Sequence, residues 1–92
     1  MPQETAIFIG KKPPMNYVLA CLTAFHEGAG EVTIKARGQS ISKAVDITEI
    51  VRRKFMPSVK VADISIGTEV IPLLEGGGTK RASSIMIRLS KI

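Results

Sequence analysis

Apolar residues recur along this chain at two spacings, and each spacing predicts one kind of element. Apolar and polar residues alternate in Glu31–Arg37, as in a strand that buries one face. The apolar positions of this strand are Val32, Ile34 and Ala36. Thr5–Ile9 is short and rich in β-forming residues, which predicts another strand, and Gly10 ends it. We expect residues 1–4 to form a mobile polar tail.

Two stretches carry apolar residues at helical spacing. The first runs from Pro13 to about Glu27, and Gly28 can end it. Its predicted inner stripe is Met15, Val18, Leu19, Leu22 and Phe25. The second ends near Phe55, and Ser40 or Ser42 can cap its start. Its predicted stripe is Ile41, Ala44, Val45, Thr48, Val51 and Phe55.

The C-terminal third of the chain predicts a β-hairpin. Val59–Leu74 is a long β-rich run whose apolar residues change parity, which indicates a bulge near Ala62–Asp63. A final strand alternates the apolar residues Ile85, Ile87 and Leu89 with polar ones. Residues 75–81 lie between these strands, and we expect them to form a flexible tip that carries Lys80 and Arg81.

The order of predicted elements is therefore β-α-β-α-β-β, in a single domain over residues 1–92. We predict an α/β fold of the two-layer α+β sandwich type, with a mixed four-stranded sheet and both helices on one face. The first two strands would be parallel and joined by a right-handed helical crossover.

The charge balance favours an anionic partner. Thirteen Lys and Arg against eight Asp and Glu give a formal net charge of +5, which points to nucleic acid before a membrane. A basic but inert surface is the alternative. The single cysteine, Cys21, allows no intramolecular disulfide, and we expect it to be buried in the first helix. No apolar run approaches the roughly 18 residues that span a bilayer, and no signal peptide is evident, so we expect an intracellular protein.

The adjacent Lys11 and Lys12 stand in a strand-to-helix loop before Pro13. A helix N-terminus carries unpaired N–H groups and partial positive charge, so two ammonium groups beside it suit a phosphate. A merely solvated lysine pair is the alternative. Asn16 and Tyr17 follow closely, and we expect Tyr17 to be partly exposed.

Further candidate contacts lie at the end of the second strand. Lys35 and Arg37 point outward there, and Gln39 and Lys43 come just beyond. We expect these residues and the lysine pair to occupy different edges of the layer, so that their merging depends on the fold.

No catalytic set emerges from the sequence. Cys21 and His26 lie five positions apart, outside the spacing of helical neighbours, and His26 suits the helix dipole better than catalysis. The glycines match neither a P-loop nor a dinucleotide fingerprint, and no acidic spacing marks a metal site. We therefore expect neither an enzyme nor a cofactor.

The four aromatic residues argue against a surface that stacks single-stranded bases, since Phe8 and Phe25 are predicted core and Phe55 is either core or a subunit contact.

The stretches IGKKPPMNYVLA and IKARGQSISKAVDITEIVRRKF resemble the Alba family, the small basic chromatin proteins of archaea. The resemblance covers almost the whole chain. It implies a fold similar to the C-terminal domain of bacterial translation initiation factor three. It also implies a cytoplasmic, chromosome-associated homodimer that binds double-stranded DNA and RNA with little sequence preference.

The resemblance also assigns roles to particular residues. It places Lys11 and Lys12 at the centre of binding and makes Lys11 a target of reversible acetylation by an acetyltransferase and a deacetylase. Arg37 matches a binding residue of the family, whereas Gln39 stands where relatives often have arginine. Other matched positions are Arg81, which relatives place in a minor groove, and Phe55, which is linked to contacts between dimers.

Two other functions stay open at this point. An RNA-binding subunit of a ribonucleoprotein is the first alternative. A phosphate-metabolite-binding enzyme that uses Lys11 and Lys12 is the second.

Overall fold

The computed structural model describes residues 4–91 and confirms the predicted order of elements. Residues 1–3 of the expected tail lie outside the described part, and Glu4 belongs to the first strand instead of the tail. The helices and turns are α1 (Pro14–His26), the 3-10 turn η1 (Gly38–Ser40), α2 (Ile41–Ile50) and the π-helical turn η2 (Val51–Phe55). The strands are β1 (Glu4–Phe8), β2 (Glu31–Arg37), β3 (Val59–Pro72) and β4 (Thr79–Lys91).

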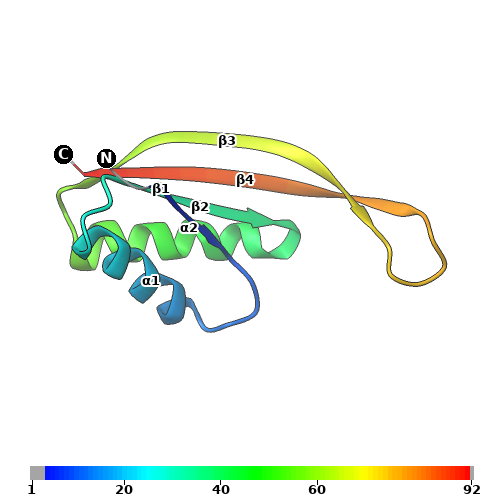
Figure 1. Cartoon of the computed structure of the whole chain (residues 1–92), viewed down its shortest axis with the longest axis horizontal. Helices are drawn as coiled ribbons and strands as arrows, with labels where there is room; N and C mark the ends of the chain where they lie inside the picture. The colour runs from blue at the N-terminus through cyan, green and yellow to red at the C-terminus, as the bar shows by residue number, and fades with distance from the viewer. Residues whose placement is uncertain (1–3, 92) are drawn as a thin grey trace.

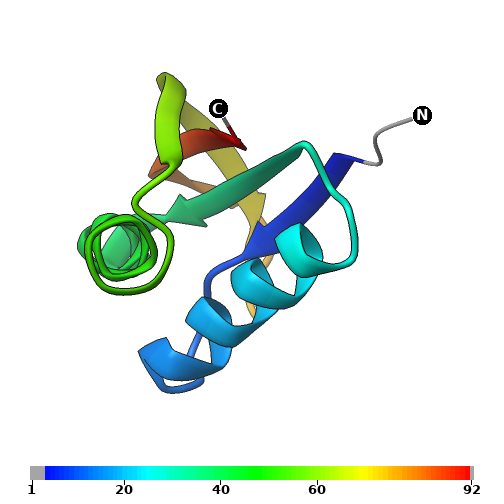
Figure 2. The same cartoon turned by 90° about the vertical axis from the view of Figure 1, so that its left-hand side faces the viewer.

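The four strands form one mixed sheet in the order β1-β2-β4-β3. β1 and β2 run parallel, whereas β4 pairs antiparallel with both β2 and β3. Both helices cover the same face of the sheet and leave the other face open (Figures 1 and 2). The α+β sandwich with two helices on one face is thereby confirmed.

A single apolar core fills the space between the sheet and the helices. Val32, Ile34 and Ala36 face it from β2, as their alternation predicted. The predicted stripe of α1 is partly wrong, because Met15 and Leu19 are 45% and 58% exposed. The buried residues of α1 are Val18, Cys21 and Phe25. The side of α1 that carries the small Cys21 therefore packs against the sheet. The helical period of the apolar residues alone does not show which side packs.

The second helix differs from its predicted stripe in a similar way. Val45 and Phe55 are 43% and 48% exposed, and Ile47 is fully buried in their place. The buried Thr48 hydroxyl donates a 2.9 Å hydrogen bond to the Ala44 carbonyl, so this polar group is satisfied inside the core. Ser40 occupies the N-cap position but makes no capping hydrogen bond, because η1 already gives it a helical backbone.

The two ends of α1 are fixed by different parts of the chain. Gly28 follows its C-terminus with a φ of 106°, a conformation that favours glycine. The Lys91 ammonium, on the last described residue of β4, donates a 3.1 Å hydrogen bond to the Phe25 carbonyl. A lysine at a helix C-terminus complements the helix dipole. His26 is exposed in the last turn, where it can act in the same way.

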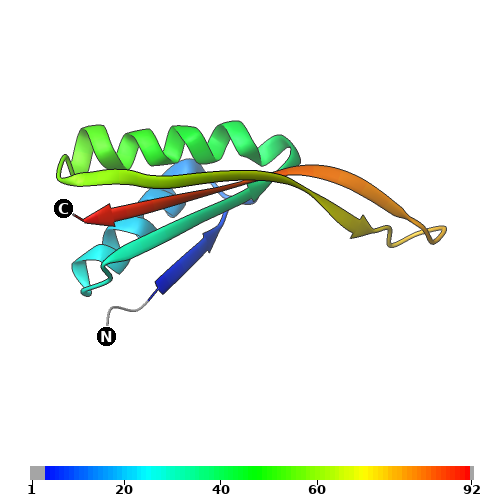
Figure 3. The same ribbon diagram turned by 90° about the horizontal axis from the view of Figure 1, so that it is seen from above.

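The β3–β4 hairpin extends well beyond the body of the molecule (Figures 1 and 3). The predicted bulge is confirmed by a register shift between Val61 and Asp63. Gly76, Gly77 and Gly78 all have positive φ and form the tip. Residues 79–81 belong to β4, so the turn is shorter than the predicted 75–81.

The buried Cys21 makes stability depend on pH in the alkaline range. Burial raises the pKa of its thiol from 9.0 to about 12. The unfolded thiol ionises at the lower value, so its contribution is constant below about pH 9. Above that pH the free energy of unfolding should fall by about 1.4 kcal/mol per pH unit. Urea unfolding of wild type and Cys21→Ala at several alkaline pH values tests this, because the two proteins differ only in the thiol. Equal pH slopes would contradict the prediction.

Candidate nucleic-acid interface

The C-terminal ends of β1 and β2 lie side by side and bring the two predicted basic groups together. The Ile9 amide donates a 2.9 Å hydrogen bond to the Lys35 carbonyl, so the chain leaves β1 along the end of β2. The lysine loop, residues 10–13, follows directly, and η1 follows Arg37. The expectation that these groups occupy different edges is wrong, because parallel strands end at the same edge of a sheet.

Tyr17 holds the backbone of the lysine loop from the first turns of α1. Its hydroxyl accepts hydrogen bonds from the Gly10 amide at 2.9 Å and from the Lys12 amide at 3.2 Å. A Cβ atom at position 10 would lie 3.3 Å from this hydroxyl, so glycine permits the close approach. Tyr17 is half-buried, as expected, and its hydroxyl is directed to the loop.

Lys43 completes this arrangement from α2. Its ammonium donates hydrogen bonds to the carbonyls of Gly10, at 2.7 Å, and of Lys12. The same nitrogen lies 5.3 Å from the centre of the Tyr17 ring, within the range of a cation–π contact. Tyr17 and Lys43 together form what we call the loop clamp. The sequence suggested Lys43 as a phosphate contact, and the structure directs its charge to the loop carbonyls.

Lys11 and Lys12 are exposed at the turn of the clamped loop. Within residues 4–91, no ion pair engages either ammonium group. The helix N-terminus contributes less than expected, because Pro13 and Pro14 have no amide hydrogen. The Asn16 amide, in the same turn, already donates to the Pro13 carbonyl at 3.0 Å. An anion here would be bound chiefly by the two ammonium groups.

The end of β2 adds further polar and basic groups. Arg37 is exposed and lies 3.8 Å from the Glu69 carboxylate at the base of the hairpin. Both side chains are more than half exposed, so this pair contributes little stability. Gln39 is exposed in η1, and Lys35 is half-buried on the open face of the sheet.

The Lys35 ammonium lies 5.6 Å from the centre of the Phe8 ring. Phe8 is 70% exposed, so its predicted place in the core is wrong. The alternation of β1 buries Ile7 and Ile9 and turns Phe8 to the open face. This exposed aromatic ring is the feature that sequence reasoning missed.

Lys80 and Arg81 are exposed on the hairpin, opposite Ile71 and Val70 in the pairing of β3 with β4. Arg37, the last residue of β2, pairs with Ser84. Lys80 and Arg81 precede Ser84 in β4, so they lie beyond the end of β2 that carries the other basic groups. Phe55 is half-exposed at the end of η2. It is therefore outside the core, and its role in a subunit contact stays a prediction.

These features define a class: a small two-layer α+β domain with a clamped basic loop and a long basic hairpin at the same end. A family model described as Alba matches residues 5–68. The DNA/RNA-binding protein Alba 1 of Archaeoglobus fulgidus is 56% identical over 88 residues, which cover 96% of this chain and 97% of that protein. The DNA/RNA-binding protein Alba of Thermoplasma acidophilum is 51% identical over 92 residues, which cover 99% of this chain and 100% of that protein. The chain belongs to the Alba family.

Solved structures support the same assignment. The structure of Alba from Thermoplasma volcanium superposes with a TM-score of 0.89 at 49% identity, and the match covers 95% of this chain and all of that one. An Alba protein of Trypanosoma brucei shares the fold, with a TM-score of 0.77 at 22% identity over 95% of this chain and 68% of the other. Among residues 4–91, no helix is long and apolar enough to cross a membrane.

Proposed function

We propose that this protein binds double-stranded DNA and RNA through contacts to the phosphate backbone, with little sequence preference. The exposed Lys11–Lys12 pair on its clamped loop is the observation that carries this proposal. The hairpin extends from the same end, and Lys80 and Arg81 on it can follow the nucleic acid further. The relatives named as DNA/RNA-binding proteins support the same function. A non-catalytic role in coating or compacting chromosomal DNA follows from it.

We further propose that the functional unit is a homodimer. Ile64 and Ile66 pair with Ile87 and Ile85 and so share the helix-covered side of the sheet. They are nevertheless 55% and 83% exposed, and β3 is an edge strand of the sheet. An exposed apolar strand at a sheet edge favours pairing with another chain. A second copy of this chain would cover these residues and bring two lysine loops into one assembly.

Lys11 is the position proposed for reversible acetylation. Its side chain is exposed, as a modifying enzyme requires. Acetylation would remove one positive charge from the loop and leave the backbone hydrogen bonds of the clamp in place. The modification would therefore weaken binding without unfolding the domain.

A titration with duplex DNA, duplex RNA and free nucleotides at one fixed salt concentration tests the proposed function. We expect both duplexes to bind and nucleotides to bind poorly. The logarithm of affinity for duplex DNA should fall with the logarithm of salt with a slope of about −0.9 per neutralised phosphate. A more than roughly tenfold preference for one duplex sequence would contradict backbone-dominated binding. Much tighter binding of RNA than of DNA would favour the ribonucleoprotein alternative.

Phe55 is proposed to join neighbouring dimers on the nucleic acid. Because the ring is half-exposed, Phe55→Ala should leave the dimer folded and reduce cooperative coating of long DNA. Electron microscopy of coated DNA and the Hill slope of binding measure this, and a thermal melt is the control. A loss of roughly 3–5 kcal/mol in the free energy of unfolding, as for a buried aromatic ring, would contradict it.

A further inference from the structure

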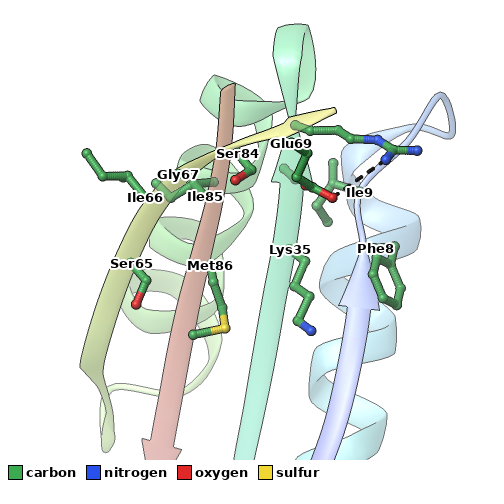
Figure 4. A pocket seen from close by; sticks show the side chains of 12 residues that line it. Phe8, Ile9, Lys35, Ser65, Ile66, Gly67, Glu69, Ser84, Ile85 and Met86 are labelled. Carbon is green, nitrogen blue, oxygen red and sulfur yellow. Dashed lines mark ion pairs between the residues drawn. The ribbon is translucent and has the colours of Figure 1, made fainter. Parts of the chain in front are cut away.

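The face of the sheet that the helices leave open is hollowed next to the lysine loop. The hollow is an open depression of about 490 Å³. Figure 4 shows Phe8, Lys35 and Met86 on this face, with Ser65 and Ser84 around it. The hollow exists because Gly67 carries no side chain and the two serines carry small ones. Ile9 borders the hollow although its side chain is buried in the core, and Lys11 follows two residues later, so the hollow lies close to the lysine loop.

The groups around the hollow suit an unpaired base with its phosphate. Phe8 is 70% exposed and presents an aromatic ring on which a base can stack. Lys35 is its partner in the pairing of β1 with β2, and Arg37 ends the same strand, so two cations lie within reach of a phosphate beside that base. The hydroxyl groups of Ser65 and Ser84 can both donate and accept hydrogen bonds at a base edge or a sugar.

We propose that this hollow binds one unpaired base of a single-stranded DNA or RNA, stacked on Phe8. A base inside a duplex is covered by its neighbours on both sides and cannot stack on the ring. The site would therefore select single strands, or the unpaired ends and loops of duplexes held by the lysine loop. The inference rests on the proposed nucleic-acid binding and adds to it a preference that Lys11 and Lys12 cannot supply.

A second copy of this chain is a poorer occupant for the hollow. The outward residues of β2 and β4 in this face are mostly polar or charged. Ile64 and Ile66 pair with the helix-side residues Ile87 and Ile85, and of the two only Ile66, on the edge strand, borders the hollow. The Arg37–Glu69 pair beside the hollow is exposed and weak, so Arg37 can turn to a phosphate at little cost.

Two variants test the site without removing a charge. Phe8→Leu keeps an apolar side chain but removes the ring, and Gly67→Val narrows the hollow. The valine is tolerable because a Cβ at position 67 would meet only the Ser84 hydroxyl, at an ordinary 3.4 Å. Leu19→Ala, at an exposed apolar position on α1 away from the hollow, is the control. The probes are oligothymidylate, oligouridylate, an abasic deoxyribose-phosphate chain of the same length, and a duplex.

We expect both variants to lose affinity for the single strands by about fivefold to a hundredfold, the range for one stacked base. Their affinities for the duplex and the abasic chain should equal those of wild type, and Leu19→Ala should change nothing. A loss with only one of the two single strands would support the site and show that it distinguishes strands that differ in the sugar and in the 5-methyl group of the base. Thermal melts establish that each variant is folded.

The ring can also be observed directly. The chain contains no tryptophan, so Phe8→Trp places a single fluorescent reporter in the site. Stacking should quench its emission when oligothymidylate or oligouridylate is added, and the abasic chain should not.

The site would be overturned if folded Phe8→Leu and Gly67→Val bound single strands as tightly as wild type. It would also be overturned if the variants lost as much affinity for the abasic chain as for the single strands. A third contrary result is that the variants change the oligomeric mass measured by sedimentation and leave the single-strand affinity unchanged. The proposed function fails separately, if wild type does not bind the duplex.

Discussion

Replacing Lys11 and Lys12 together by glutamine is expected to remove most of the salt-dependent affinity for duplex DNA. If each lysine neutralises one phosphate in each subunit of a dimer, each substitution flattens the salt slope by about 1.8 and the double variant by about 3.6. Both side chains are exposed and the clamp binds only the loop backbone, so the fold should persist. Exposed substitutions usually change the free energy of unfolding by less than about 0.5 kcal/mol each.

The measurement is duplex affinity at several salt concentrations for wild type, both single variants and the double variant. Lys54→Gln with Lys60→Gln is the matched control, because it removes the same charge near the other end of the sheet, where Lys60 pairs with Ser90. The control should keep most of the slope. An unchanged slope in the folded Lys11/Lys12 double variant would show that the loop is not the phosphate site.

Lys43→Met is expected to weaken duplex binding by about tenfold while leaving the salt slope nearly unchanged. The substitution removes the ammonium that holds the Gly10 and Lys12 carbonyls, so the loop must be ordered when nucleic acid binds. Ordering one backbone residue costs about 1–2 kcal/mol, which is the source of the tenfold estimate. Lys11 and Lys12 still neutralise the same phosphates, so the slope persists. Loss of hydrogen bonds from a charged donor should lower the free energy of unfolding by about 1–3 kcal/mol.

Tyr17→Phe tests the same clamp from its other side, because it keeps the ring beside Lys43 and removes the hydroxyl that accepts from two amides. It should also weaken binding at constant slope. Lys54→Met removes one charge without touching the loop and serves as the control. A slope that falls by about 0.9 per subunit in Lys43→Met would assign Lys43 to a phosphate instead of to the loop.

Much of the fold could be predicted from the spacing of apolar residues. The alternation in β2 predicted its buried face, and the parity change in β3 predicted the bulge at Val61–Asp63. These patterns are local, since they follow from the geometry of one strand. The helix stripes were less successful, because Met15, Leu19 and Val45 fit the helical period and yet lie outside the core. Which side of a helix is buried depends on how the helix is oriented when it packs against the sheet.

The sequence by itself determined the order of elements, the position of Lys11 and Lys12 in a strand-to-helix loop, and the resemblance to the Alba family. Each of these depends on neighbouring residues or on whole stretches of sequence. Only the tertiary structure decided that the ends of β1 and β2 unite the basic groups. It also decided that Lys43 holds a loop more than 30 residues away and that Phe8 faces the open side of the sheet. The physical reason is that these contacts join segments that are distant in sequence, so that strand pairing and packing, and no local pattern, bring them together.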